Sequence, residues 1–271
     1  MKCNRRWPSR GDDVTVTETM TLRSDTDRDW NALGELDPYW AVLTHEAYRE
    51  STAPDQEKLE AFLASGRQHV DRIWDVIESS LGGQFAPDRA LDFGCGVGRI
   101  VFPLAERCRF VLGVDVAESM LAHARVLSKH LNLSNVGFTQ CDDSLAVADG
   151  AFDLVHSYIV FQHVPARRGL QLLETRIGKL SENGVGVLHV LYDNPDMNSR
   201  PSRWVKTVGR LLKRPFRPIP QMQMNAYPLN EVWRIIQASG IRQIHVLPTD
   251  HGGCLGLVLC FRRASNAAYL V

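Results

Sequence analysis

The 271-residue chain lacks any hydrophobic run near the roughly 20 residues that a membrane-crossing helix needs. Its N-terminal stretch begins with basic residues but holds no apolar segment of the kind that secretory signals carry. The chain also lacks an excess of charge, because 31 Lys and Arg side chains balance 31 Asp and Glu side chains. These absences count against membrane insertion, secretion and a broad nucleic-acid-binding surface, and we expect a cytoplasmic protein.

Motifs for metal and disulfide chemistry are missing as well. The six cysteines include no CxxC pair, and the nine histidines include no HExxH pattern. We therefore expect neither a metal site nor a disulfide framework, and we expect a reducing compartment. Cys95 and Cys141 have no basic partner at a spacing that would activate a thiol, so we interpret both as buried loop thiols.

What the chain does contain is an alternation of short apolar segments with helical periods. Strands that alternate with helices of this length predict a parallel sheet covered by helices on both faces. The last two strands are joined by TDHGG, which predicts an antiparallel hairpin. We expect an α/β fold with a doubly wound, mostly parallel, seven-stranded sheet and an antiparallel C-terminal strand. The predicted strands are 89–93, 110–115, 136–140, 151–160, 184–192, 241–248 and 254–263, with helices near 98–108, 118–131, 167–180 and 229–239.

Segments outside this alternation suggest further parts. The N-terminal residues are rich in Thr, Asp and Arg and poor in periodic apolar residues, which is typical of a flexible tail. An apolar stripe that includes Val70, Ile73 and Ile77 follows at helical spacing. The predicted organisation is a flexible tail at 1–35, a helical extension or cap at 36–84, a main domain at 85–263 with an insertion at 193–225, and a short tail at 264–271.

The insertion is rich in proline and carries seven basic residues between Arg200 and Arg217. One interpretation is a solvated basic face without a function of its own. The other is a basic lid over the sheet edge that attracts an anionic acceptor or a nucleic acid backbone. Because the net charge of the whole chain is zero, we favour a small-molecule partner over nucleic acid.

The stretch ALDFGCGVGRI at 90–100 sets one acidic side chain and three glycines at the end of the first predicted strand. Open α/β sheets bind ligands at that end of their strands, and glycines let the backbone approach a ligand closely. A dinucleotide fingerprint would need glycine where the chain has Arg99, and no P-loop lysine follows the glycines. Asp92 would repel phosphates but suits a cationic ammonium group, so a pyrophosphate is not the favoured ligand.

Two more acidic sites follow the next two strands. Asp115 ends the second strand, 21 residues after Gly94, where a carboxylate can take both hydroxyls of a ribose. Asp142 and Asp143 follow the third strand, where a carboxylate can accept a hydrogen bond from an adenine amino group. Together the three sites describe a ligand with an amino-acid end, a ribose and an adenine, as in S-adenosylmethionine.

At these residues the chain resembles the class I, seven-stranded S-adenosylmethionine-dependent methyltransferases. The resemblance rests on LDFGCGVGR, VLGVDVAESML, TQCDDSL, FDLVHSYIVFQHVP and SENGVGVLHV in that order, and it departs at ENG (182–184), where the family often has Pro-Gly-Gly. It implies S-adenosylmethionine as cofactor, with Asp92 at the methionine end and Met120 on the adenine face. The binding residues that the resemblance implies are Asp92, Gly94, Cys95, Gly96, Arg99, Asp115, Val116, Met120, Asp142, Asp143, Ser157, Tyr158 and Gln162.

Methyl transfer from a sulfonium is an in-line displacement, which depends mainly on alignment of the reacting atoms. His163 follows the fourth strand and is our candidate general base, with capping or packing as the alternative role. Aromatic residues of the flanking segments are candidates for acceptor contact or for ordinary packing. The candidates for the acceptor pocket are Trp40, Tyr48, Tyr227 and His251.

Several functions remain open at this point. The leading hypothesis is transfer of a methyl group to a small molecule. The alternatives are a methyltransferase acting on tRNA or protein, a non-catalytic S-adenosylmethionine-binding regulatory module, and a nicotinamide-dependent oxidoreductase. The sequence leaves the acceptor atom and the oligomeric state open, a homodimer being one arrangement that it allows.

Overall fold

The computed structural model describes residues 26–49, 53–141, 143–146, 149–195, 220 and 222–263. The basic stretch from Arg200 to Arg217 and the predicted C-terminal tail lie outside these residues. The strands are β1 (Arg89–Phe93), β2 (Phe110–Asp115), β3 (Val136–Gln140), β4 (Phe152–Ser157), β5 (Leu180–Asp193), β6 (Gln243–His251) and β7 (Cys254–Arg262). The helices are α1 (Thr26–Leu36), α2 (Pro38–Leu43), α3 (Gln56–Ser80), α4 (Val101–Ala105), α5 (Glu118–His130), α6 (Ala166–Gly178) and α9 (Leu229–Ala238), with short 3-10 turns η1 (Glu46–Tyr48) and η2 (Phe161–His163).

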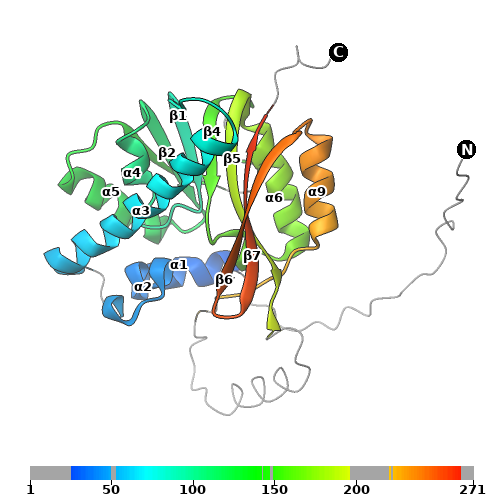
Figure 1. Cartoon of the computed structure of the whole chain (residues 1–271). Coiled ribbons are helices and arrows are strands. Elements are labelled where there is room, and N and C mark those ends of the chain that lie inside the picture. The colour runs from blue at the N-terminus through cyan, green and yellow to red at the C-terminus, as the bar shows by residue number, and fades with distance from the viewer. Residues whose placement is uncertain are drawn as a thin grey trace, which may run out of the picture.

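The strands form one sheet in the order β3-β2-β1-β4-β5-β7-β6. Strands β1 to β5 pair in parallel, while β7 runs antiparallel to both β5 and β6. Helices α3, α4 and α5 cover one face of the sheet, and α6 and α9 cover the other (Figure 1). The predicted doubly wound, seven-stranded sheet with one reversed C-terminal strand is therefore confirmed.

The β6–β7 hairpin turns more tightly than the sequence pattern predicted. Strand β6 continues through Thr249, Asp250 and His251, and β7 begins at Cys254, so only Gly252 and Gly253 remain in the turn, with φ of 67° and 92°. A two-residue hairpin turn with two positive φ angles strongly favours glycine at both positions. This extension carries His251 to the end of β6, next to the edge where the parallel strands end (Figure 1).

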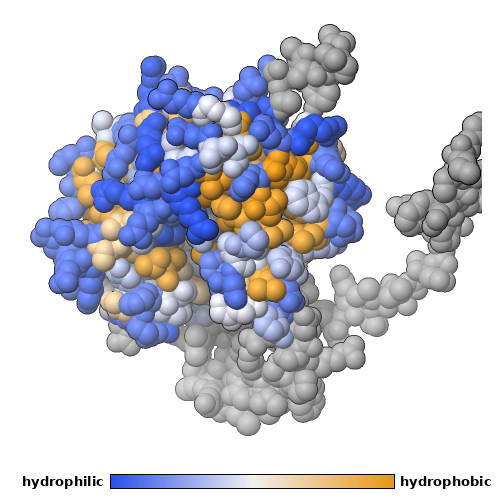
Figure 2. Space-filling view, viewed as in Figure 1, coloured by the Kyte–Doolittle hydropathy of each residue, from blue (hydrophilic) through white to orange (hydrophobic). Residues whose placement is uncertain are grey.

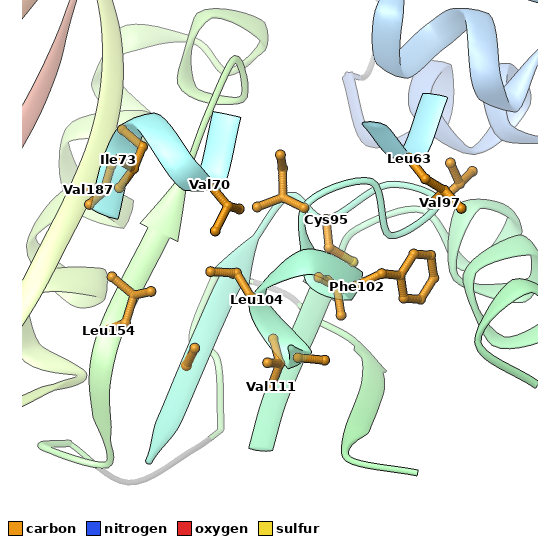
Figure 3. Packing of buried hydrophobic residues seen from close by; sticks show 14 of the residues in the cluster. Leu63, Val70, Ile73, Cys95, Val97, Phe102, Leu104, Val111, Leu154 and Val187 are labelled. Carbon is orange, nitrogen blue, oxygen red and sulfur yellow. The ribbon is translucent and has the colours of Figure 1, made fainter. Parts of the chain in front are cut away.

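Each face of the sheet has its own hydrophobic core, because side chains alternate along a strand. Along β1, Ala90 belongs to the core beneath α3 and α4, whereas Leu91 belongs to the core beneath α6 and α9. Figure 3 shows the first core, in which Val70 and Ile73 of α3 lie over the strands. Packing on this face fixes the position of α3, which also supplies part of the site described below.

The prediction of a flexible tail at 1–35 is wrong from residue 26, where α1 begins. This helix is held by contacts distant in sequence. The hydroxyl of Ser119 in α5 donates to the Asn31 carbonyl over 2.7 Å, and Arg168 of α6 pairs with Asp27. Because these partners lie about 90 and 140 residues away, composition near the N-terminus gave no signal for them.

The surface around the sheet edge differs from the surface over α3 to α5. Figure 2 shows mainly hydrophilic side chains over α3 to α5 and an apolar area over the β6–β7 hairpin. Edge strand β6 includes the half-buried Ile244 and Val246 and the exposed Pro248, a residue that edge strands tolerate because it offers no N–H for pairing. None of the helices in the described ranges is long and apolar enough to cross a membrane.

Candidate functional site

A cavity of about 730 Å³ opens at the edge where the parallel strands end. Its two sides have different origins, and we name them by their residues. The loop wall comes from the segments after β1, β2 and β3 and comprises Asp92, Gly94, Cys95, Gly96, Asp115, Val116, Met120, Cys141 and Asp143. The helix wall comes from α1 to α3, the ends of β4 and β6, and the turn η2, and it comprises Trp30, Val42, His69, Arg72, Tyr158, His163 and His251.

The glycine loop fits closely between β2 and the helix wall. The backbone N–H groups of Gly94 and Cys95 both donate to the Val114 carbonyl, over 2.8 and 3.0 Å. Gly94 has φ of 75°, and a Cβ on it would lie 2.4 Å from the Val160 side chain. Only glycine meets both conditions without strain, so the loop backbone itself forms this part of the wall.

Asp115 lies directly beneath the glycine loop at the end of β2. Its carboxylate accepts hydrogen bonds from the backbone N–H groups of Gly96 and Ala117, each over 2.9 Å. Burial raises the pKa of Asp115 to about 6, although these backbone hydrogen bonds act in the opposite direction. The carboxylate is therefore mostly ionised near neutral pH and is held in one orientation.

The loop after β3 is tied to α6 and α1 by a single arginine. Arg168 donates to both oxygens of Asp27 over 2.6 and 2.8 Å, and to both oxygens of Asp143. The two carboxylates raise the pKa of the Arg168 guanidinium. Asp143 and α1 are thus brought to the same end of the cavity, while Asp142, the predicted adenine contact, lies outside the described residues.

Asp92 faces the cavity from β1 and is joined to β4. Nδ1 of His156 lies 2.7 Å from Oδ1 of Asp92, and both side chains are at least 96% buried. The two residues are register neighbours on adjacent parallel strands, which explains their contact. His156 in turn lies 2.9 Å from Nε2 of His69, a residue of α3.

Aromatic and cationic side chains surround His69 on the helix wall. The Tyr158 ring lies with its centroid 4.2 Å from that of His69 and 6.2 Å from that of His251. Arg99 is 7% exposed, and its Nε has no hydrogen-bond partner among the described residues. Burial lowers the pKa of His251 as well as that of Arg99.

His163, the predicted general base, does line the cavity, but both of its ring nitrogens are engaged. Nδ1 donates to the Gln223 carbonyl over 2.7 Å, and Nε2 lies 3.3 Å from the Gln162 amide nitrogen. The Trp30 ring packs against it with centroids 4.8 Å apart. Burial lowers the pKa of His163 to about 4, so the ring is neutral near neutral pH.

Most of the residues predicted to bind the cofactor come together around this cavity. Those that line it are Asp92, Gly94, Cys95, Gly96, Arg99, Asp115, Val116, Met120, Asp143, Tyr158 and Gln162. Ser157 does not, because its fully buried hydroxyl donates to the Phe93 carbonyl over 2.9 Å. Cys95 and Cys141 are buried as predicted, and burial raises the pKa of the Cys95 thiol well above its usual value.

Of the four predicted acceptor contacts, only His251 lines the cavity. The prediction is wrong for Tyr48, which packs against Phe62 in the core with ring centroids 5.6 Å apart. It is wrong for Tyr227, whose buried hydroxyl donates to the carbonyls of two residues near η2. It is also wrong for Trp40, which lies outside the cavity with the Arg49 guanidinium 3.7 Å above its ring. Aromatic content alone does not distinguish a pocket wall from a core.

The residues of the site that the sequence did not predict include Trp30, His69, Arg72 and His156. One signal was available for His156, since it is the next-to-last residue of β4 as Asp92 is of β1. No comparable signal marked His69 and Arg72, because the helix that carries them reads as an ordinary amphipathic segment.

Comparisons with known proteins agree with this geometry. Residues 90–184 match the family model described as a methyltransferase domain. The chain is 36% identical over 94 residues to the 23S rRNA (uracil(1939)-C(5))-methyltransferase RlmD of Alkalilimnicola ehrlichii, covering 33% of this chain and 20% of that protein. It is 34% identical over 91 residues to the ubiquinone biosynthesis O-methyltransferase of Acinetobacter baumannii, covering 33% of this chain and 38% of that protein. The chain therefore spans well under half the length of these curated relatives.

The fold as a whole is similar to that of a solved enzyme. The crystal structure of magnesium protoporphyrin IX methyltransferase from Synechocystis PCC 6803, with bound S-adenosylhomocysteine, superposes with a TM-score of 0.58. The match has 19% sequence identity and covers 88% of this chain and 98% of that one. At this identity the likeness concerns the fold, and it agrees with the predicted sheet architecture.

Proposed function

We propose that this chain, whose residues 90–184 match the model of a methyltransferase domain, binds S-adenosylmethionine and transfers its methyl group to a small-molecule acceptor. The observation that carries the proposal is the loop wall. The carboxyl ends of β1 and β2 and the loop after β3 bring Asp92, Asp115 and Asp143 to one side of a single cavity. The carboxylates of Asp92 and Asp115 suit the ammonium group and the ribose hydroxyls of an adenosyl sulfonium, while both oxygens of Asp143 accept from Arg168.

The residues of the cavity fit this cofactor. Asp115 is buried, oriented by two backbone N–H groups and suited to the ribose hydroxyls. Oδ2 of Asp92 has no hydrogen-bond partner in the described ranges and suits an ammonium group, and the guanidinium of Arg99, which lines the same cavity, suits a carboxylate. Met120 supplies an apolar contact for the adenine base of the cofactor. When bound, the cofactor supplies an electrophilic methyl group on a positively charged sulfur.

Enclosure of the cavity supports a small-molecule acceptor. Helices α1 and α2 contribute Thr26, Trp30 and Val42 to its wall, and Arg168 anchors α1 in place. A methyl position beneath this cover is accessible to a compact molecule more readily than to a folded RNA or protein. One of the curated relatives is named as an rRNA methyltransferase and another as a ubiquinone biosynthesis O-methyltransferase. The acceptor class of this chain therefore requires a direct test.

Calorimetry of the purified chain with S-adenosylhomocysteine tests the cofactor site, with the oxidised nicotinamide dinucleotide as the comparison ligand. We expect binding of the first and not of the second. Replacement Asp92→Asn removes the charge that suits the ammonium group and should weaken binding about tenfold or more, since hydrogen bonds to charged groups contribute about 1.5–3 kcal/mol. Asp75→Asn, an exposed position on α3, is the matched control and should leave affinity unchanged.

Transfer of an isotopically labelled methyl group tests the acceptor class. The chain and the labelled cofactor are incubated together in three separate reactions, which contain a metabolite extract, total RNA or total protein. We expect label in the metabolite fraction. Label only in RNA or protein would overturn the small-molecule acceptor, and binding without any transfer would favour a regulatory module. Nicotinamide binding without uptake of S-adenosylhomocysteine would overturn the whole proposal.

A further inference from the structure

Three side chains form a hydrogen-bonded chain from the centre of the sheet to the helix wall. Asp92 of β1 contacts His156 of β4 over 2.7 Å, and His156 contacts His69 of α3 over 2.9 Å between the two Nε2 atoms. Asp92 and His156 are both almost completely buried. This series of hydrogen bonds therefore connects Asp92, the predicted cofactor contact on the loop wall, with His69 on the helix wall.

The chemistry of the three groups fixes the direction of the hydrogen bonds. A carboxylate only accepts, so Nδ1 of His156 carries the proton and donates to Asp92. In a neutral ring, Nε2 of His156 is then a lone pair, and Nε2–H of His69 must donate to it. Nδ1 of His69 is consequently left as a lone pair that can accept a proton.

That nitrogen is not engaged by the other described residues. His69 lines the cavity, and its Nδ1 forms no hydrogen bond with the described residues. This Nδ1 is also not one of the fully buried polar atoms that lack a partner. Burial lowers the pKa of His69 well below its usual value, with the positive fields of neighbouring groups acting in the same direction. The ring is thus neutral near neutral pH. The titratable and charged groups that face it are His156, Arg99, His189, Arg72 and Tyr158.

His163 offers a contrast within the same cavity. Both of its nitrogens already have partners, Gln223 and Gln162, so a proton could enter only by displacing the Gln162 amide. In the described part of the chain, the ring of His163 forms no hydrogen bond with a carboxylate. His69 has the free lone pair and, through His156, the carboxylate that stabilises an imidazolium.

We infer that His69 is the proton acceptor for a hydroxyl-bearing substrate, with His156 and Asp92 as positioning residues, and this inference rests on the proposed function. The acceptor oxygen forms a bond to the methyl carbon while the carbon–sulfur bond breaks and leaves its electron pair on sulfur. The acceptor proton moves to Nδ1 of His69. The charge lost from sulfur thus reappears on the His69–His156 pair beside Asp92, and the proton later returns to water.

The chemical class of acceptor follows from the basicity of this group. Imidazole is a weak base, so it suits a phenolic hydroxyl, whose pKa is about 10 as in tyrosine, far better than the less acidic aliphatic alcohol. The aromatic ring of Tyr158 beside His69 offers a surface for stacking such a ring.

The test uses the full-length protein with two catechol probes. In 3,4-dihydroxybenzoate the hydroxyls keep their protons near neutral pH, whereas in 4-nitrocatechol one hydroxyl has already lost its proton. We expect His69→Gln to lower kcat on the first probe about 100-fold or more, and to lower kcat on the second far less. Affinity for S-adenosylhomocysteine, measured by calorimetry, should stay within about twofold of wild type. His130→Gln, exposed on α5, is the matched control and should behave like wild type.

Every other outcome counts against the inference. Equal losses on both probes would mean that His69 acts only through structure, and an unchanged rate would remove its role. Loss of turnover in His163→Gln but not in His69→Gln would assign the proton to His163. Binding of S-adenosylhomocysteine without transfer to either catechol would overturn the phenolic acceptor and leave the cofactor site standing. Absence of that binding in the wild type would overturn the proposed function first, and this inference with it.

Discussion

The two walls of the cavity differ in how the chain builds them. The loop wall runs from Asp92 to Asp143, within a single stretch of consecutive β/α units. The helix wall joins Trp30 of α1, His69 of α3 and His251 of β6, which are spread over most of the chain. A wall built from consecutive units follows from local order, whereas the other wall depends on how distant elements pack. The two walls should therefore respond differently to substitution.

The largest effect should come from the glycine loop. Gly94→Ala places a Cβ 2.4 Å from Val160 at a φ of 75°, and we expect affinity for S-adenosylhomocysteine to fall about 100-fold or more as the loop shifts. Gly83→Ala is a matched control, because Gly83 has φ of 76° but nothing within 4 Å of its Cβ position. Gly83→Ala should lose about 1 kcal/mol of unfolding free energy from backbone strain. Gly94→Ala should lose more because of its contact with Val160, and only Gly94→Ala should lose affinity. Equal affinities in calorimetry would contradict the assignment of the loop wall.

The next effect should come from Asp115. Asp115→Asn removes the ionised acceptor for the ribose hydroxyls, and we expect affinity for S-adenosylhomocysteine to fall roughly 10- to 100-fold. The wild type should also lose affinity as pH falls through about 6, the raised pKa of this buried group, and the variant should not. Calorimetry across this pH range checks both statements, and a pH-independent wild type would refute the second.

Folding stability should show the opposite dependence at the same residue. Because burial raises the folded-state pKa of Asp115 above its ordinary value of 3.8, its favourable contribution is present below that value. The contribution is lost as pH rises through about 6. Urea unfolding of wild type and Asp115→Asn should therefore differ in pH dependence over this interval, with the variant less dependent on pH.

A smaller effect, on stability and not on cofactor affinity, is expected from a residue of the core that supports the cavity. Tyr227→Phe removes the buried hydroxyl, whose single proton is shared between the carbonyls of Phe161 and Val164. We expect a loss of about 1–2 kcal/mol in unfolding free energy, with unchanged affinity for S-adenosylhomocysteine. Tyr192→Phe, at a half-exposed side chain, is the control and should be neutral. A selective loss of acceptor binding at full stability would restore Tyr227 as an acceptor contact.

The smallest effect should come from the attachment of α1. Arg168→Gln breaks the partly exposed pairs with Asp27 and Asp143, and such pairs contribute about 0–1 kcal/mol. Global stability should hardly change, but amide hydrogen exchange in α1 should accelerate because its link to α6 is gone. Arg234→Gln, which breaks an exposed pair within α9, is the control and should leave α1 unchanged. Unchanged exchange in α1 would show that its other contacts suffice.

The sequence predicted the strands and the loop wall because both follow from local rules. Apolar segments alternate with helical periods, and in a parallel sheet their carboxyl ends meet at one edge. Asp92, Gly94 and Asp115 lie at such ends, so their convergence was predictable. The α1 helix was not, because its stability comes from contacts with α5 and α6 rather than from its own residues.

By itself the sequence determined the sheet, its reversed last strand and the acidic and glycine residues of the loop wall, since each depends on neighbours along the chain. Only the tertiary structure decided which aromatic and imidazole side chains face the cavity. Tyr48 and Tyr227 went to the core while His69 reached the cavity. The physical reason is that side-chain direction across a packed helix or between strands is set by what lies opposite, and that partner is distant in sequence.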